Sequence, residues 1–540
     1  MARDVAVKRQ IIRKKKRLTA LVGVACAVLA SVAGLQVASA AQTISVLNMG
    51  TTFLPPRGLD PGQDAQNQYL YSGHETLLTL SPEGKPVPLL ATSFTRPNPF
   101  VYRFALRKGV KFWSGNEMTA TDVANSLNYL RYPGLPSSAG AYKSIRDVRA
   151  VGKYTVDITL KRRDATLPAL LAYRGSIFEK KYFDAHKDTY GKPSTSVAVM
   201  GTGPWIPRSF VLLVGEELDA NPNYWGGKPK IDHISVKQFR DETSMALALR
   251  AGQIDIAFPG GAAAFQATSG ITPIVDPNGT QMFYYQMNVK KAPWSDIHVR
   301  RAIAYAVNRS DIVAAFGASY AKPLATFITP QQLATLVPKR QVDALLKSLP
   351  QYPFDLAKAR AEMAKSSVPN GFSMTIRTYN GFALPVQLQV IQQQLKQIGI
   401  TLNIQQLASI SAYSAANEDP PDAWESSYFY ANQLAPDAGD VINRYLGSWN
   451  IKQRFPNRSN WGPADVDALL KQGSATYDPA KRFEIYGKLL KRVADELPYI
   501  WFLTGHRTAF VNSKYTFKAP GLIHNYPNIN WPQYVVPKAA

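Results

Sequence analysis

The sequence has 540 residues but a single cysteine, Cys26. Cys26 lies inside an apolar run from Leu18 to Leu35, close to the N-terminus. If this run is removed on maturation, the remaining chain has no thiol. It can then form no disulfide, no cysteine nucleophile and no zinc–thiolate site. A chain of this length does not need disulfides, because its hydrophobic core is large enough without them.

Sequence signatures of catalysis are also missing. The chain contains no H-E-x-x-H, no G-x-S-x-G and no Walker A loop. Histidine is scarce, and its six residues are spread from His74 to His524. We therefore expect no enzymatic activity, no metal site and no cofactor. The alternative is a secreted hydrolase of peptides or glycans, whose dispersed catalytic residues meet only in the folded chain.

Acidic residues are few, with 38 Asp and Glu against 62 Lys and Arg, so the formal net charge is +24. After Arg17, Lys and Arg form no run of five or more. Proteins that bind nucleic acid usually concentrate positive charge in a patch or stripe. We therefore expect a solvated basic surface and no nucleic-acid partner. A periplasmic chaperone or a binder of anionic polymers is a further alternative, which predicts broad, salt-dependent binding.

The N-terminal residues have the pattern of a secretory signal peptide. Lys and Arg crowd the segment from Arg3 to Arg17, the apolar run follows, and Ala38-Ser39-Ala40 fits a cleavage site. We predict a leader at residues 1–40, a mature protein that begins at Ala41 and a periplasmic location. An uncleaved membrane anchor is the alternative that the length of the apolar run permits.

Strand-like and helix-like patterns alternate along the rest of the chain, which indicates an α/β protein. Residues 102–106 alternate apolar and polar side chains as in a half-buried strand, and a helix is predicted to begin near Ala120. A helical stripe over 384–398 ends at a glycine, and a strand is predicted over 400–404. Asp478-Pro479 predicts the start of the last long helix. The length suggests two or three domains or lobes.

Seven short segments occur in an order typical of one protein family. They are Leu59-Asp60-Pro61, Phe104 to Phe112, Thr119 to Val123, Gly201-Thr202-Gly203-Pro204-Trp205, Asn221-Pro222-Asn223-Tyr224-Trp225, Ala251 to Asp255, and Val299 to Ile303 leading to Asn308-Arg309. With this set the chain resembles the extracytoplasmic solute-binding proteins of ABC importers, family 5, which includes dipeptide- and oligopeptide-binding proteins. Most of these segments contain turn and cap residues, so we expect them to hold the fold rather than to contact ligand.

The resemblance implies a two-lobed periplasmic-binding-protein fold of type II, in the large cluster with an extra subdomain. Lobe one would comprise residues 41–286 with 504–540, and lobe two residues 287–503. Two strands near Tyr285 to Val289 and Phe502 to His506 would form a hinge, and the ligand would lie in a cleft between the lobes.

The same resemblance implies that the protein captures peptides or peptide-like small molecules. It would deliver them to the membrane permease of an ABC importer, which works with ATPase subunits. The binding protein itself would be a monomer.

In peptide-binding members of the family, an aspartate in lobe two pairs with the amino terminus of the peptide. The matching segment here has Asn432, which has no charge to offer an ammonium group. Asp437 or Asp440 are the substitutes if the register is shifted. We therefore predict weaker dependence on a free α-amine than in a dipeptide-binding relative.

Aromatic residues are the other candidates for ligand contact. Trp424, Tyr428 and Tyr430 precede or flank the Asn432 segment, and Tyr284 and Tyr285 lie beside the predicted hinge. Each could stack on ligand or simply fill the core, because alternate residues of a strand face opposite ways. Arg377 and Arg444 are possible partners for a ligand carboxylate or phosphate, with solvated surface as the alternative.

Overall fold

The structure is a computed structural model. It describes residues 43–63, 73–135, 142–265, 269–275, 281–408, 412–413, 416, 425–432, 437–451, 457–506, 508–517 and 531–538. The chain divides into Met1–Thr43 and a compact unit, Ile44–Ala540, that carries all the elements below. The predicted leader and Trp424 lie outside the described residues.

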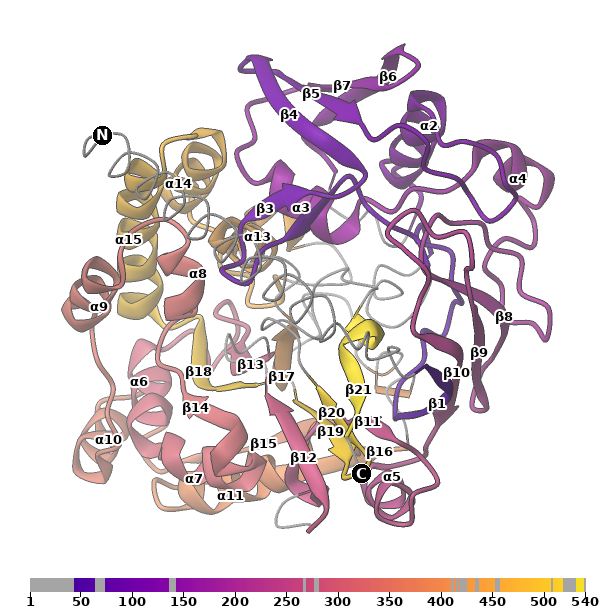
Figure 1. Cartoon of the computed structure of the whole chain (residues 1–540). Coiled ribbons are helices and arrows are strands. Elements are labelled where there is room, and N and C mark those ends of the chain that lie inside the picture. Colours follow the sequence, from indigo (N-terminus) through magenta and orange to yellow (C-terminus); the bar gives the residue numbers. More distant parts are fainter. Residues whose placement is uncertain are drawn as a thin grey trace, which may run out of the picture. The chain divides into compact units, whose positions relative to one another are not determined.

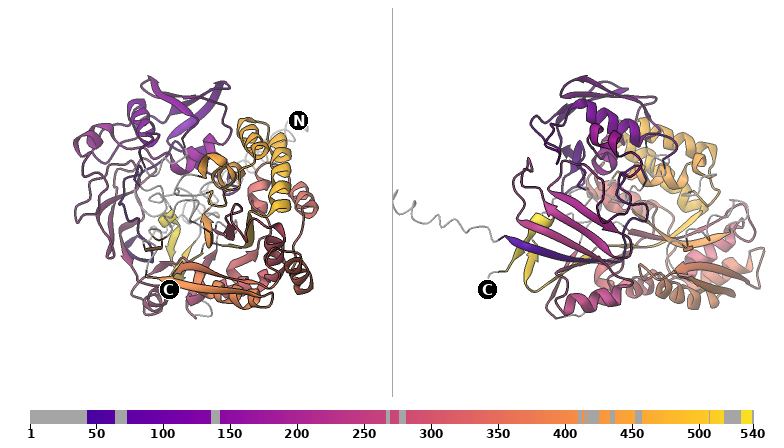
Figure 2. Two further views of the ribbon diagram at one scale, coloured as in Figure 1. Left: turned by 180° about the vertical axis from the view of Figure 1, so that it is seen from behind. Right: turned by 90° about the vertical axis from the view of Figure 1, so that its right-hand side faces the viewer.

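A seven-stranded sheet forms one part of the compact unit, in the order β12-β19-β11-β1-β10-β9-β8 (Figures 1 and 2). β1 is parallel to both of its neighbours, β10 and β11, whereas the remaining pairs are antiparallel. The strands are β1 (Ile44–Thr51), β8 (Trp205–Val211), β9 (Gly215–Ala220), β10 (Ile231–Gln238), β11 (Ile256–Phe258), β12 (Ile271–Val275) and β19 (Thr508–Asn512).

A second sheet, here called the β5 sheet, has the order β4-β5-β7-β6. Its strands are β4 (Ala91–Asn98), β5 (Val101–Leu106), β6 (Ile145–Gly152) and β7 (Thr155–Leu160). Every second side chain of β5 is buried, as the alternation predicted. Helix α2 (Ala120–Leu130) begins where it was predicted, because the backbone N–H of Thr119 donates to the Asp122 carboxylate over 2.9 Å.

A third sheet, here called the β13 sheet, has the order β14-β18-β13-β17. Its strands are β13 (Gln281–Met287), β14 (Ala321–Pro323), β17 (Ser426–Asn432) and β18 (Tyr499–Gly505). The parallel pair β15 (Phe372–Tyr379) and β16 (Ile400–Leu407) belongs to the same part of the chain. The predicted helix-then-strand unit is confirmed: α11 (Leu384–Lys396) is followed by Gly399 at φ +82° and then by β16.

Short pairs and helices complete the unit. The pairs are β2 (Leu78–Leu80) with β3 (Pro86–Pro88) and β20 (Tyr515–Phe517) with β21 (Val535–Pro537). The other helices are α3 (Leu167–Arg174), α4 (Lys180–Ala185), α5 (Glu242–Arg250), α6 (Ile297–Ala306), α7 (Arg309–Phe316), α8 (Pro330–Ala334), α9 (Lys339–Ser348), α10 (Leu356–Ala364), α13 (Ala438–Leu446), α14 (Ala464–Ala475) and α15 (Pro479–Glu496). Asp478 caps α15, as predicted. Within the described ranges, no helix combines the length and apolarity that crossing a membrane requires.

The chain passes between the seven-stranded sheet and the β13 sheet twice. β12 ends at Val275 in the first sheet and β13 begins at Gln281 in the second, whereas β18 ends at Gly505 and β19 begins at Thr508 back in the first. One hydrophobic cluster spans both sheets near these crossings. In this cluster the ring of Phe510 packs against Tyr320, with ring centroids 5.7 Å apart.

Candidate ligand-binding site

The predicted residue Asn432 lies at the end of the β13 sheet where the crossings occur. It is the last residue of β17, and its backbone is opposite Gln281, the first residue of β13. Gln281 in turn is opposite Gly505, the last residue of β18. The strand pairing therefore places Asn432 beside both crossings, although Asn432 is far from each of them in the sequence.

All four predicted tyrosines are buried, Tyr430 at 8% exposure included, and three of them lie on the two faces of the β13 sheet. Tyr284 packs against Trp501, with ring centroids 4.9 Å apart. On the opposite face Tyr285 contacts the Met374 sulfur at 3.2 Å, and Tyr428 donates from its hydroxyl to Gln387 over 2.5 Å. Their surroundings are those of core residues, the alternative that the sequence left open.

Tyr430 belongs to an aromatic cluster beside the N-terminus of α11. Its ring lies 4.2 Å from that of Phe382 and 4.6 Å from that of Phe429. Phe429 stacks on Tyr413, with ring centroids 5.0 Å apart and planes within 7°, and Tyr379 packs beside Tyr413 at 5.4 Å. We call these five residues the aromatic cluster; rings of this kind offer stacking surfaces for planar or apolar parts of a ligand.

Glu242 connects the aromatic cluster to the seven-stranded sheet. As the first residue of α5, it follows β10, and its carboxylate accepts from the backbone N–H of Gly261 over 2.7 Å and from the backbone of Phe382. Burial raises the pKa of Glu242 to about 7, although these backbone hydrogen bonds act in the opposite direction. This carboxylate therefore joins two parts of the chain that belong to different sheets.

The backbone at Gly260 lies close to the ring of Phe382. A side chain at Gly260 would bring its Cβ within 2.9 Å of the Phe382 ring. Phe382 and Ala383 both have positive φ, at 54° and 55°, in a region that non-glycine residues seldom adopt. Consecutive residues held in this conformation are typical of segments whose geometry the surroundings impose.

Positive side chains lie near the same cluster. Burial raises the pKa of the Tyr413 hydroxyl, and the charges of Arg458 and Arg377 partly oppose this rise. Arg377 also donates to the carbonyl of Ala416. The guanidinium of Arg444, the other arginine singled out from the sequence, lies 5.4 Å from the centre of the Tyr445 ring. Of Arg377 and Arg444, Arg377 is therefore the one whose charge acts on a member of the aromatic cluster.

Asp437 has structural partners. Its carboxylate caps α13 by accepting from the Gly439 N–H over 2.8 Å, and it forms a buried ion pair with Arg482 over 2.6 Å. Arg482 also donates to the Tyr486 hydroxyl over 2.9 Å. The negative charge of Asp437 is thus already neutralised within the protein. For Asp440, only its place in α13 is described.

Two of the family-type segments meet at one buried carboxylate, Glu75. It accepts from the Thr202 hydroxyl at 2.8 Å, the Tyr224 hydroxyl at 2.8 Å and the Trp225 indole at 2.7 Å. Burial raises the pKa of Glu75 to about 7, against the effect of these hydrogen bonds. The segments around Thr202 and Tyr224 therefore hold the fold together, as expected. Sequence reasoning singled out neither Glu75 nor Glu242, because their partners are distant in sequence.

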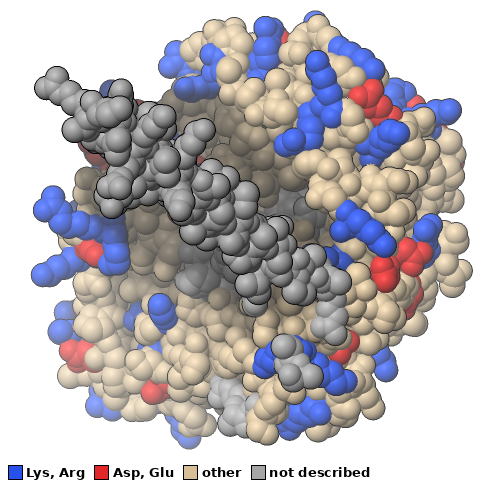
Figure 3. Space-filling view, viewed as in Figure 1, with Lys and Arg blue, Asp and Glu red and all other residues tan. Residues whose placement is uncertain are grey.

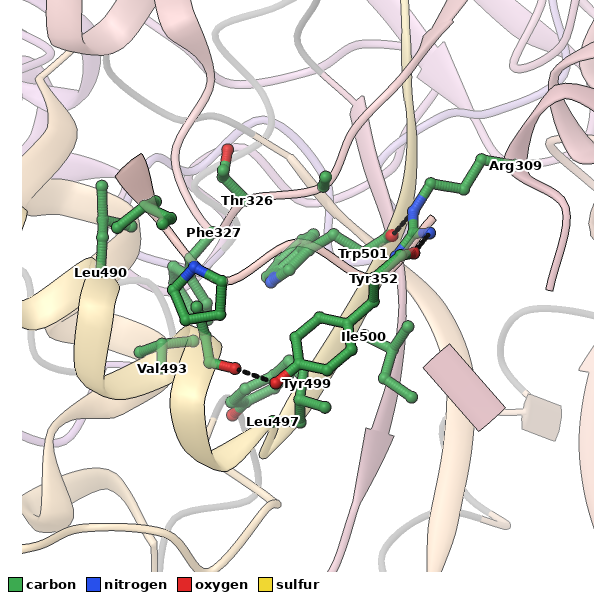
Figure 4. Close-up of a pocket in the computed structure, with 14 residues that line it drawn as sticks. Arg309, Thr326, Phe327, Tyr352, Leu490, Val493, Leu497, Tyr499, Ile500 and Trp501 are labelled. Atoms are coloured by element: carbon green, nitrogen blue, oxygen red, sulfur yellow. Dashed lines mark hydrogen bonds between the residues drawn. The ribbon is translucent and has the colours of Figure 1, made fainter. Parts of the chain in front are cut away.

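A cavity of about 30 Å³ lies beside the β13 sheet, between β18, α15 and the segment before α8 (Figure 4). Phe327, Tyr352, Tyr499 and Trp501 line it, and the Tyr352 hydroxyl donates to the Ala494 carbonyl over 3.0 Å. This volume accommodates a water molecule but not a peptide. None of the residues that line it belongs to the aromatic cluster around Tyr430.

On the face in Figure 3, Lys and Arg are scattered, with Asp and Glu among them. Among the residues described, no group of three or more His, Cys, Asp or Glu is arranged to hold a metal ion.

Comparison with known proteins identifies the fold and the family. Residues 85–453 match the family model of the bacterial extracellular solute-binding proteins, family 5 Middle. The glutathione-binding protein GsiB of Escherichia coli (strain K12) is 29% identical over 494 residues, which cover 88% of this chain and 91% of GsiB.

Solved structures agree in fold. DppA from Helicobacter pylori, in complex with the peptide STSA, has a TM-score of 0.77 at 22% identity. The match covers 92% of this chain and 99% of the DppA chain. MoaA from A. tumefaciens R10, in complex with mannopinic acid, has a TM-score of 0.76 at 23% identity. The match covers 92% of this chain and 100% of the MoaA chain. These matches define the fold as that of the periplasmic binding proteins.

The chain belongs to family 5 of the bacterial extracellular solute-binding proteins. It is the solute-binding component of an ABC importer, so its partners include a permease, and the family is one of extracytoplasmic proteins without enzymatic activity. The α/β fold and the family predicted from the sequence are confirmed. The hydrolase alternative is excluded by family membership.

Proposed function

We propose that this protein captures a peptide or peptide-like solute between two lobes, closes around it and delivers it to the importer's membrane permease. The observation that carries the proposal is the double crossing between the seven-stranded sheet and the β13 sheet. Two connecting segments make a hinge, which permits an open and a closed state of the same chain. A ligand that contacts both lobes then favours the closed state.

The strand pairing supports a more exact position for this hinge. β13 pairs with β18 from its first residue, so Gln281 and the residues after it belong with lobe two. We place the outward crossing between Val275 and Gln281, and the return between Gly505 and Thr508. Lobe one, predicted from the sequence to extend to residue 286, would then end at the first of these crossings.

Contacts that β4, the turn after it and the segment before α3 make with α14–α15 supply the closing surface in this proposal. The Tyr477 hydroxyl donates to the Pro99 carbonyl over 2.8 Å, and the Arg96 guanidinium lies 3.5 Å from the centre of the Tyr477 ring. The Ala165 N–H donates to the Ser474 carbonyl over 2.8 Å. Each contact joins lobe one to lobe two. They would form on closure and break on opening.

For the ligand we propose an acidic, peptide-like compound whose α-amine is not held by a carboxylate. Asn432 stands at the end of β17, and Asp437 is neutralised by Arg482. Tyr430 and the rest of the aromatic cluster would stack on the ligand, with Arg377 supplying positive charge nearby. GsiB is named for glutathione and MoaA was solved with mannopinic acid, both of which are acidic amino-acid derivatives.

The remaining predictions complete the proposal. Cleavage of the leader after Ala40 would release the mature protein into the periplasm. There it would act as a monomer, without metal or cofactor, and would dock on a permease that works with ATPase subunits.

The test is a thermal-shift and calorimetry panel on the mature protein from Ala41, with glutathione, mannopinic acid, free dipeptides and their N-acetylated forms. A ligand that binds the native state raises the melting temperature by mass action. Saturable binding of one acidic class, retained on N-acetylation, supports the proposal. Binding of free dipeptides that N-acetylation abolishes contradicts the proposed ligand class, and turnover of any of these compounds contradicts the transport function.

A further inference from the structure

The turn that joins β8 to β9 exposes three consecutive apolar side chains. Leu212, Leu213 and Val214 are 36%, 82% and 64% exposed. Hairpin turns usually carry Gly, Asn, Asp or other polar residues, and exposed apolar residues usually occur singly. We call Leu212–Val214 the hairpin tip. Its composition is the opposite of what a solvated turn requires.

The hairpin tip is also held in a fixed shape. Leu213 has φ +63°, a conformation that favours Gly or Asn over Leu. Its N–H donates to the side-chain oxygen of Gln238 over 2.8 Å, and the N–H of Gln238 donates to the Val214 carbonyl over 2.8 Å. The Val214 N–H donates to the Val211 carbonyl over 3.2 Å. A protruding apolar turn that is already ordered loses little conformational freedom when a partner covers it.

Topology places the hairpin tip at the end of the sheet that faces lobe two. β8 and β9 form one edge of the seven-stranded sheet, whereas β12 and β19, which lead to the crossings, form the other. The tip bonds to Gln238, which lies opposite Thr51 at the carboxyl end of β1. Four residues beyond Gln238, Glu242 contacts Phe382 of lobe two. The tip therefore lies at the sheet end from which the chain crosses to lobe two, at the edge remote from the crossings.

We propose that the hairpin tip is an anchor that inserts into an apolar pocket on the importer's membrane subunits. The inference rests on the proposed delivery function, because ligand must leave between the lobes and the permease must meet the surface around that exit. Three side chains fit a small pocket at the centre of a larger contact. They are too few for a stable dimer of this chain, since stable interfaces bury roughly 1,200–2,000 Å² in total.

The test uses the mature protein and its importer, membrane subunits with ATPases, reconstituted in nanodiscs. The variant Leu213→Asn with Val214→Ser removes the apolar surface and places at position 213 a residue that tolerates the left-handed conformation. The matched control is Leu247→Asn, which removes a 56% exposed leucine from α5 in the same lobe. Melting temperature and glutathione binding are measured on every variant.

We expect the double variant to keep the melting temperature and the glutathione response of the wild type. Its affinity for the nanodisc-bound importer should fall about tenfold or more, while Leu247→Asn remains at the wild-type value. Equal affinity of the double variant and the wild type overturns the proposal. The proposal is also overturned if the double variant loses as much binding to nanodiscs of lipid alone as to nanodiscs with the importer. It is overturned, too, if sedimentation shows that the double variant has lost a self-association that the wild type has. A wild-type protein that does not bind the importer contradicts the delivery function itself.

Discussion

The hydroxyl of Tyr477 donates a hydrogen bond to the carbonyl of Pro99 over 2.8 Å, across 378 positions of sequence. Tyr477 lies between α14 and α15, in the proposed lobe two, and Pro99 lies in the turn between β4 and β5, in the proposed lobe one. The contact is one of those that define the closed state in this account.

Tyr477→Phe removes this hydrogen bond and keeps the ring under Arg96. A hydrogen bond of this kind contributes roughly 0.5–1.5 kcal/mol, so closure should become less favourable and ligand affinity should fall about 2- to 10-fold. The melting temperature of the ligand-free protein should change little. Calorimetry with the strongest ligand of the panel measures the effect. Tyr132→Phe, on an exposed tyrosine after α2, is the control; unchanged affinity in Tyr477→Phe would show that the contact plays no part in closure.

Glu242 predicts a dependence of stability on pH. Its folded-state pKa of about 7 lies above the value of 4.5 for an unperturbed glutamate. The folded chain therefore holds this proton more tightly than the unfolded chain. The resulting stability is fully present below pH 4.5, and it is lost as the pH rises toward and through 7. Unfolding by denaturant at pH 5 and pH 8 measures the difference.

Glu242→Gln removes the titrating group. The stability of this variant should fall less between pH 5 and pH 8 than that of the wild type, by roughly 1–3 kcal/mol. Glu484→Gln, on the exposed face of α15, is the control and should keep the wild-type slope. An unchanged slope in Glu242→Gln would mean that this carboxylate stays ionised in the fold.

Arg482→Leu leaves the Asp437 carboxylate buried without its counter-ion. Removal of one member of a buried ion pair costs about 3–5 kcal/mol, which denaturant unfolding measures. The double variant Arg482→Leu with Asp437→Asn should regain part of that loss, because Asn remains a good helix N-cap. If ligand affinity falls sharply in the double variant while stability recovers, Asp437 acts on ligand directly and its structural assignment is wrong.

Asn432→Asp should create the amine anchor that we propose to be missing from the wild type. A charge-assisted hydrogen bond is roughly twice as strong as a neutral one, so affinity for dipeptides with a free α-amine should rise about 5- to 10-fold. N-acetylated dipeptides should gain nothing. Asn403→Asp, on an exposed position of β16, controls for the added charge. Equal gains in both variants would trace the effect to net charge rather than to the position of residue 432.

Local elements were predictable because their signals are local. The helix that ends near Gly399 and the helix start at Asp478-Pro479 depend on caps and on apolar spacing within a few residues. Two of the family segments, around Thr202 and Tyr224, likewise keep their own local signals, although both also bond to the buried carboxylate of Glu75. The positions of these elements along the chain therefore required no knowledge of distant contacts.

The site was less predictable because long-range pairing decides it. Alternation could not separate pocket from core for Tyr284 and Tyr285, since both faces of the β13 sheet are buried. Glu242 has no sequence motif, and its contact with Phe382 arises only when two sheets meet. The crossings follow from the pairing of β13 with β18, which residues near Tyr285 do not reveal.

The most direct test of the account is the distance between the lobes with and without ligand. Residues 41–540 contain no cysteine, so Thr95→Cys and Lys481→Cys in this segment can carry a single pair of spin labels on exposed positions of the two proposed lobes. We predict a broad distribution with long distances in the ligand-free protein, and a single short distance when a ligand of the panel saturates it. An unchanged distribution, in a protein that calorimetry shows to be fully bound, would contradict closure around the ligand.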